Sequence, residues 1–206
     1  MFITFEGIDF CGKSTQVLLL QKYLENKGER VVIIREPGGT EISEKIRDIL
    51  LDKKNYKMVT ESEIFLFSAS RAQLVREKIR PFLDEGYYVI SDRFHDSTTA
   101  YQGYGRGLPI ESVETINHVA IDKTIPDITF IIDIPGEELT KRKNLKHRSE
   151  LDRIEVSHNK FYDRVREGYL TIAKKENRFR VIDGTKTIDE IHSIVINELI
   201  LFERRS

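Results

Sequence analysis

A phosphate-binding motif near the amino terminus constrains the fold more than any other feature of this sequence. The pattern G-x-x-x-x-G-K-[ST] is completed by Gly7, Gly12, Lys13 and Ser14. The apolar run Phe2–Phe5 before it predicts a buried strand, and the amphipathic pattern of Gln16–Leu24 after it predicts a helix. A loop between a strand and a helix can direct backbone N–H groups and the positive helix end at one anion. This order therefore predicts a nucleoside triphosphate site.

Two side chains of this motif have predicted chemical tasks. Lys13 can reach the β- and γ-phosphates, and the hydroxyl of Ser14 can bind Mg²⁺. We expect the whole loop to contact the triphosphate, namely Gly7, Ile8, Asp9, Phe10, Cys11, Gly12, Lys13, Ser14 and Thr15.

Size and composition limit the kind of partner. With 206 residues we expect one domain over residues 1–206, with at most a small movable insert. The formal net charge of −1 removes the simplest electrostatic case for nucleic acid. No apolar run approaches the ~20 residues of a membrane span, and acidic Glu6 and Asp9 stand where a signal peptide would be basic. The one cysteine fits a reducing cytoplasm. We expect a cytoplasmic protein whose partners are small molecules, neither nucleic acid nor membrane.

Short apolar runs alternate with helical patterns along the chain, and this order predicts an α/β fold. We expect strands at Phe2–Glu6, Arg30–Arg35, Tyr87–Ser91, Ile128–Asp133 and Phe179–Asp183. We expect helices at Val17–Asn26, Ser43–Leu51, Glu61–Glu85, Ile110–Ile121, Glu137–Lys143, Glu155–Lys175 and Ile188–Phe202. Nearly continuous apolar strands indicate a parallel sheet with helices on both faces. Ligands of such sheets bind at the carboxyl ends of the strands.

The phosphate-binding loop alone leaves two classes of function open: a phosphotransferase, and a GTPase-like switch or binding module. A GTPase reads guanine through an N/T-K-x-D motif, and this sequence contains none. A nucleic-acid motor would need more length and more positive charge. The favoured interpretation is therefore a phosphotransferase.

Five motifs together resemble those of the thymidylate kinase family. They are FEGID..GKSTQ, REPGGT, FSASR, SDRFHDSTTAYQGYGRG and ELDRIE, and the resemblance runs from about Phe2 to Gly184. It implies an enzyme that passes the γ-phosphoryl group of ATP, bound with Mg²⁺, to dTMP in dTTP synthesis. It also implies a P-loop fold with a five-stranded parallel sheet, a small flexible lid at about 141–155, and a homodimer. A kinase for another pyrimidine nucleotide or deoxynucleoside stays open as the alternative.

The phosphate of the acceptor is predicted to meet arginines. Arg93 directly follows the third strand and can bind a phosphate with two guanidinium arms. The resemblance implies that Arg47 lies near the same phosphate and that Asp9 and Glu36 lie near the acceptor sugar and phosphate. Asp92 ends an apolar strand, where it can hold Mg²⁺ through water or cap the next segment.

The base of the acceptor is predicted to meet one helix face. Phe67 and Arg71 are four residues apart, so a helix presents both on the same side. The resemblance implies that Phe67 stacks on thymine and that Arg71 meets its 4-keto oxygen, although a phenylalanine in this pattern, taken alone, more often belongs to the core. It places Thr98 and Gln102 at the other polar atoms of the base and Tyr101 against the deoxyribose.

The sequence departs from the family at the arginine that stabilises the transferred phosphoryl group. One branch of the family has this arginine in the phosphate-binding loop, and another has glycine there and an arginine in the lid. This chain has Phe10 at that position, so we expect a lid arginine, Arg148 first and Arg142 or Arg153 otherwise. Arg142 could instead stack on adenine. The expected catalytic residues are Lys13, Arg93, Arg148 and Asp9.

Overall fold

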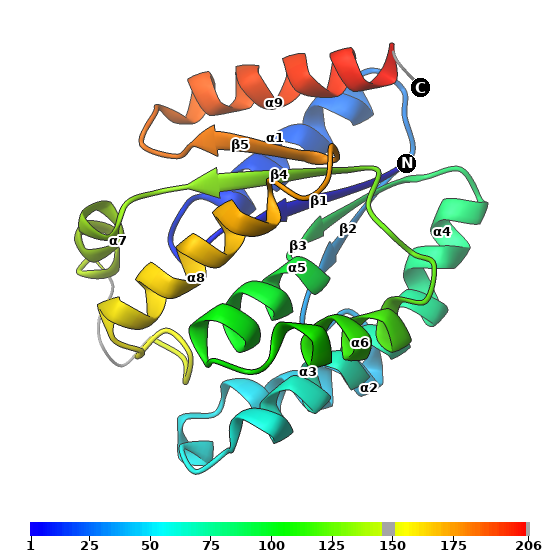
Figure 1. Cartoon of the computed structure of the whole chain (residues 1–206). Coiled ribbons are helices and arrows are strands. Elements are labelled where there is room, and N and C mark those ends of the chain that lie inside the picture. Colours follow the sequence, from blue (N-terminus) through cyan, green and yellow to red (C-terminus); the bar gives the residue numbers. More distant parts are fainter. Residues whose placement is uncertain (146–150, 205–206) are drawn as a thin grey trace.

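The computed structural model, which describes residues 1–145 and 151–204, is built on a five-stranded parallel sheet (Figure 1). Its strands are β1 (Phe2–Glu6), β2 (Val31–Arg35), β3 (Tyr88–Asp92), β4 (Ile128–Asp133) and β5 (Phe179–Asp183), in the order β2-β3-β1-β4-β5. In the central pairs Ile3 lies opposite Ile90 and Phe5 lies opposite Phe130. The predicted α/β fold with five parallel strands is confirmed, and β2 and β3 each begin one residue later than expected.

Helices cover both faces of this sheet. On one face α1 (Lys13–Asn26) packs beside α9 (Ile188–Glu203), and on the other lie α3 (Thr60–Leu74), α5 (His95–Thr98), α6 (Ile110–Ile121) and α8 (Asn159–Ile172). Further helical elements are α2 (Glu41–Leu51), which packs on α3, η1 (Lys53–Asn55), α4 (Arg80–Asp84) and α7 (Gly136–Lys143), together with two π-helical segments described below. Across residues 1–145 and 151–204, no helix combines the length and apolar character that crossing a membrane requires.

The core lies along the middle strands. Ile3, Phe5, Ile90 and Phe130 are completely buried, and the rings of Phe5 and Phe130 are 5.2 Å apart between centroids. Burial of each such side chain contributes about 1.5–3 kcal/mol. The core therefore fixes the strand ends from which the loops of the site leave.

The helical stretch predicted over Glu61–Glu85 is confirmed, since the chain is helical from Thr60 to Asp84, but it is not one regular α-helix. The α3 helix ends at Leu74, and a π-helical segment η2 (Val75–Ile79) precedes α4. Pro81 has no N–H group, and its ring would clash with the carbonyl of a regular turn before it. The N–H of Arg80 instead bonds to the carbonyl of Val75, five residues back, so the wider turn accommodates the proline.

The helix predicted over Glu155–Lys175 is shorter, because α8 covers Asn159–Ile172. The carboxylate of Asp152 accepts the backbone N–H groups of Ile154 and Glu155, each at 2.8 Å, and the Glu155 carboxylate accepts that of Asp152 at 3.0 Å. Such side-chain bonds compete with helix formation. The segment before α8 therefore forms turns.

One helical segment is absent from the sequence-based expectations. After β3 the chain forms α5 and continues as a π-helix, η3 (Thr99–Gly105), which packs closely on α8. A Cβ atom on Gly105 would lie 2.7 Å from side-chain atoms of Phe161 and Val165. Glycine has a low helix propensity, which is why the sequence does not predict a helix here. The absence of a side chain at Gly105 is what allows η3 to approach α8.

Candidate active site

A pocket of about 550 Å³ opens at the carboxyl end of the sheet, between the phosphate-binding loop and the ends of β2 and β3. The predicted site residues that line it are Asp9, Phe10, Gly12, Lys13, Ser14, Thr15, Glu36, Arg47, Phe67, Arg71, Asp92, Arg93, Thr98, Tyr101, Gln102 and Arg142. Gly7, Ile8 and Cys11 belong to the loop but do not line the pocket. Arg148 and the middle of the expected lid at 141–155 lie outside the described residues.

The phosphate-binding loop follows β1 directly and leads into α1. Gly12 precedes the helix with φ 100°, a left-handed conformation that glycine adopts without strain. The ammonium group of Lys13 is buried and donates to the carbonyls of Gly7 at 3.1 Å and Ile8 at 2.9 Å. The lysine thus lies along the inner side of the loop, and its N–H groups are satisfied by the loop itself.

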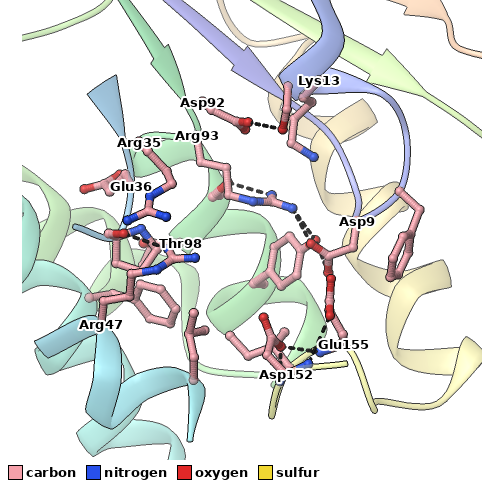
Figure 2. Close-up of a pocket in the computed structure, with 18 of the residues that line it drawn as sticks. Asp9, Lys13, Arg35, Glu36, Arg47, Asp92, Arg93, Thr98, Asp152 and Glu155 are labelled. Carbon is pink, nitrogen blue, oxygen red and sulfur yellow. Dashed lines mark hydrogen bonds and ion pairs between the residues drawn. The ribbon is translucent and has the colours of Figure 1, made fainter. Parts of the chain in front are cut away.

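Two oxygen-bearing side chains meet beside the loop. The hydroxyl of Ser14, in the first turn of α1, donates to the carboxylate of Asp92 at 2.5 Å. Asp92, labelled in Figure 2, ends β3, so the pair connects the start of α1 with the end of β3. Hydroxyl and carboxylate oxygens are the ligands that Mg²⁺ prefers. Among the described residues no group of three or more His, Cys, Asp or Glu side chains could hold a metal on its own.

Arg93 occupies the centre of the pocket wall. Arg93 directly follows β3, and its backbone φ of 74° is left-handed, a costly conformation for a residue with a side chain. The guanidinium group donates to Asp9 Oδ1 at 2.6 Å, the Gly7 carbonyl at 2.9 Å and Tyr101 Oη at 3.1 Å. The left-handed backbone of Arg93 therefore directs the guanidinium group toward the phosphate-binding loop, and its bonds to Asp9, Gly7 and Tyr101 fix its position.

The Asp9 carboxylate has a donor on each oxygen. While Oδ1 pairs with Arg93, Oδ2 accepts the hydroxyls of Tyr101 at 3.0 Å and Tyr162 at 2.9 Å. Burial alone would raise the pKa of Asp9, but the charges of Arg93 and Lys13 and the two tyrosine hydroxyls outweigh it, so that pKa lies below its ordinary value. Asp9 is therefore ionised at neutral pH.

The opposite side of the pocket contains a second buried ion pair. Arg71 Nε lies 2.6 Å from Glu36 Oε1, and both side chains are 1% exposed. Arg71 also donates to Asn117 Oδ1 at 3.2 Å and to the carbonyl of Phe94 at 3.4 Å. Burial raises the pKa of Glu36 to about 7, against the opposing charge of Arg71. The Arg71 guanidinium is thus held in one orientation where it lines the pocket.

Further polar groups stand near Arg71. The Thr98 hydroxyl is buried and has no hydrogen-bond partner among the described residues. Gln102 donates its amide to Glu63 at 2.8 Å, and Arg47 donates to the carbonyl of Pro37 at 2.8 Å. In Figure 2, Arg47, Glu36 and Thr98 lie across the pocket from Asp9 and Lys13.

The two candidate lid arginines within the described residues have different positions. Arg142, in α7, donates to the carbonyls of Phe10 at 3.3 Å, Cys11 at 3.2 Å and Gly184 at 2.8 Å, so it lies beside the phosphate-binding loop. Arg153 is instead paired with Glu63 at 2.6 Å and donates to the Leu50 carbonyl at 2.7 Å. Of these two arginines, Arg142 is therefore the one that contacts the phosphate-binding loop.

Several residues of the site carry no assignment in the sequence analysis. Arg35, Asp152 and Glu155 line the pocket, and Figure 2 shows Asp152 and Glu155 together along one edge of it. All three stand in the motifs REPGGT and ELDRIE, so the signal was present without a role attached. Tyr162 and Glu63 contact site residues from other helices, and no local pattern marks them.

The similarity to known proteins extends over nearly the whole chain. The family model described as Thymidylate kinase matches residues 5–195. A thymidylate kinase of Thermosipho melanesiensis is 52% identical over 193 residues, covering 94% of both chains, and one of Fervidobacterium nodosum is 50% identical over 196 residues, covering 95% of this chain and 96% of the relative. The crystal structure of thymidylate kinase from Ehrlichia chaffeensis superposes with a TM-score of 0.79 at 40% identity, covering 97% of both chains.

Proposed function

Because this chain belongs to the thymidylate kinase family and phosphorylates dTMP to dTDP with ATP, we propose that the pocket described above holds both nucleotides end to end. One observation carries the proposal: the phosphate-binding loop and the wall formed by Phe67, Arg71, Thr98 and Gln102 line the same pocket. Arg93 lies between these two regions, where the phosphates of donor and acceptor would meet.

The reaction asks the protein chiefly for positioning and charge stabilisation. An oxygen of the dTMP phosphate attacks the γ-phosphorus while the bond from that phosphorus to the β,γ-bridging oxygen breaks, which gives dTDP and ADP. Lys13 leaves its bonds to the loop carbonyls and binds the β- and γ-phosphates. Arg93 and Arg47 bind the acceptor phosphate. Asp9 holds the guanidinium of Arg93 in place while negative charge shifts between the phosphates.

The wall around Arg71 would select the base. Phe67 offers its ring for stacking, and Arg71, fixed by Glu36, donates to the 4-keto oxygen of thymine. Thr98 brings a buried hydroxyl whose bonding capacity no described residue uses. Gln102 meets the remaining polar edge of the base, and Tyr101 lies against the deoxyribose.

The Ser14 and Asp92 oxygens, 2.5 Å apart beside the loop, fit a Mg²⁺ ion that arrives with ATP. Ser14 would bind the ion directly and Asp92 would bind it through water. When bound, the ion neutralises charge on the β- and γ-phosphates. Activity that is lost on chelation and restored by added Mg²⁺ is the expected observation.

A lid arginine would stabilise the migrating phosphoryl group, because Phe10 brings no charge to the loop. Arg148 remains the first candidate, and it lies outside the described residues. Arg142, already bonded to the loop carbonyls, is the alternative and could also contact adenine. The turnover of the Arg148→Ala and Arg142→Ala variants separates the two assignments.

A homodimer and a cytoplasmic location complete the proposal. Apolar side chains stand exposed on helices that pack side by side, namely Ile42 and Ile49 on α2, Phe65 on α3 and Val119 on α6. Burial of these residues against a second copy would remove apolar surface from water. Light scattering of the purified protein should therefore give the mass of two chains.

The free thiol of Cys11 fits a reducing compartment such as the cytoplasm.

The proposal is tested with purified protein, Mg-ATP and a panel of nucleosides and monophosphates, scored by ADP release. dTMP should be the preferred acceptor. Arg71→Ala should raise the KM for dTMP by about tenfold or more, since a buried charged donor to the base is lost, and leave the KM for ATP almost unchanged. Arg76→Ala, which removes an arginine that within the described residues donates to the backbone carbonyls of Ala72, Ala120 and Val119, is the control. Equal losses for both nucleotides in Arg71→Ala would contradict the assignment.

A further inference from the structure

Glu63 is a buried carboxylate behind the base wall. It lies on α3, its side chain is 2% exposed, and it does not line the pocket. Its carboxylate accepts hydrogen bonds from the side-chain amide of Gln102 at 2.8 Å and from Arg106 Nε at 3.2 Å. It also forms an ion pair with Arg153 Nη2 at 2.6 Å. Both carboxylate oxygens therefore have donors, and one of these donors belongs to a residue of the base wall.

The surroundings keep Glu63 ionised. Burial by itself would raise the pKa of Glu63, but the charge of Arg106, the hydrogen bond from Gln102 and the charge and hydrogen bond of Arg153 outweigh it. The pKa of the carboxyl group is therefore below its ordinary value. An ionised carboxylate accepts hydrogen bonds and donates none.

This property decides which way the amide of Gln102 points. Because Glu63 only accepts, the NH₂ group of Gln102 must face it, and the carbonyl oxygen is left for another partner. Within residues 1–145 and 151–204, no hydrogen bond reaches that oxygen, and Gln102 lines the pocket. The base wall thus presents an acceptor at Gln102.

We propose that Glu63 fixes the amide of Gln102 so that the pocket selects pyrimidines that carry a hydrogen on N3. Thymine and uracil have an N3–H donor, which an amide oxygen accepts, whereas N3 of cytosine is itself an acceptor and would face that oxygen without a hydrogen between them. The inference rests on the proposed function, in which Gln102 meets the base. Glu63 is a positioning residue, since it acts through Gln102.

The test compares kcat/KM for dTMP and dCMP in two variants that share one change. Arg106→Gln removes one donor from Glu63 and keeps the carboxylate, so the dTMP/dCMP ratio should stay at the wild-type value. The double variant Glu63→Gln/Arg106→Gln keeps the same net charge as the wild type. Glu63→Gln alone would leave both Arg106 and Arg153 without their carboxylate partner, and the second change removes one of these two positive charges. A glutamine at position 63 can donate as well as accept, so the Gln102 amide can turn over. The dTMP/dCMP ratio should then fall about tenfold or more.

An unchanged ratio in the double variant would overturn the inference. Gln102→Leu separates this outcome from a failure of the proposed function: if it leaves kcat/KM for dTMP unaltered, Gln102 does not meet the base at all.

A measurement on the unaltered protein covers the case in which the double variant does not fold. The side-chain NH₂ protons of Gln102, identified by their loss in Gln102→Leu, should remain slow to exchange with water when dTMP saturates the enzyme, because both states keep that group on Glu63. A loss of this protection on dTMP binding would overturn the inference.

Discussion

At the scale of single residues, Asp9 shows how the site is assembled from distant parts of the chain. Its carboxylate is held by Arg93 at the end of β3, by Tyr101 in η3 and by Tyr162 in α8. The last of these partners is 153 positions away in the sequence. Each donor lowers the pKa of Asp9, so the three contacts together decide how firmly the carboxylate stays charged beside Arg93.

Removal of the Tyr162 hydroxyl should change the pH dependence of the reaction. Tyr162→Phe deletes one donor to Asp9 Oδ2 and leaves Tyr101 and Arg93 in place. Without that hydrogen bond the pKa of Asp9 rises, so the acid limb of kcat/KM for dTMP should move to higher pH, with a roughly three- to tenfold loss at neutral pH. Tyr56→Phe, which changes a tyrosine 75% exposed, is the control. An unmoved acid limb in Tyr162→Phe would show that this contact does not tune Asp9.

The contrast between Tyr162 and Lys13 explains which site residues a sequence can reveal. Lys13 and Ser14 stand at fixed spacing in a contiguous motif, and Phe67 and Arg71 share a helix face, so their proximity follows from local geometry. Tyr162 reaches Asp9 only because α8 packs on η3. Such a contact depends on tertiary packing, and one sequence alone contains no pattern that reports it.

At the scale of elements, the same reasoning separates the predicted segments from the missed ones. Strands with continuous apolar runs were predicted to within a residue, since burial on both faces leaves little choice of composition. The η3 segment was missed because Gly103 and Gly105 weaken a helix by propensity. Close packing against Ile110 and α8 outweighs that preference, because a side chain at either glycine would overlap its neighbours.

Gly105→Ala tests whether this close packing positions Tyr101 and Gln102. The added methyl group would lie 2.7 Å from Phe161 and Val165, so η3 must move away from α8. Overpacking of this kind costs about 1–3 kcal/mol of folding free energy. The KM for dTMP should rise more than the KM for ATP, since Tyr101 and Gln102, which η3 carries into the pocket, are proposed to meet the acceptor.

Gly136→Ala is the matched control for that variant. Gly136 is also helical, and its added methyl group would meet only the end of the Asp163 side chain, which can turn away. Thermal unfolding and the two KM values should remain near those of the wild type. A Gly105→Ala protein that matches this control in stability and in KM for dTMP would show that the η3–α8 contact is not limiting.

At the scale of the whole molecule, Glu6 connects strand β1 to the helices α5 and α8 through buried hydrogen bonds. It ends β1 and accepts the backbone N–H of Phe94 at 2.7 Å, the hydroxyl of Ser97 at 2.6 Å and the hydroxyl of Tyr169 at 2.9 Å. Ser97 in turn accepts from Arg93 at 3.1 Å. The carboxylate thus lies one contact behind the centre of the pocket, at a point where β1, α5 and α8 meet.

Burial and the nearby negative charge of Asp96 raise the pKa of Glu6 from 4.5 to about 7. The folded protein therefore holds a proton on Glu6 more tightly than the unfolded chain does. Stability from this group is complete below pH 4.5 and is lost as the pH rises through about 7. Between pH 5.5 and pH 8.5 the loss should amount to roughly 2 kcal/mol of unfolding free energy.

Glu6→Gln removes this titration while it keeps the size of the side chain. Urea unfolding at pH 5.5 and at pH 8.5 should therefore show a free-energy difference between wild type and variant that shifts by roughly 2 kcal/mol in favour of the variant at the higher pH. The other titrating groups are common to both proteins, so the contributions of those that do not interact with Glu6 cancel in the comparison. Glu114→Gln, which alters a half-exposed carboxylate paired with Lys175, should show a difference from wild type that is nearly the same at both pH values. If Glu6→Gln behaves like Glu114→Gln, Glu6 is ionised throughout this range, and its three donors rather than its burial determine its charge.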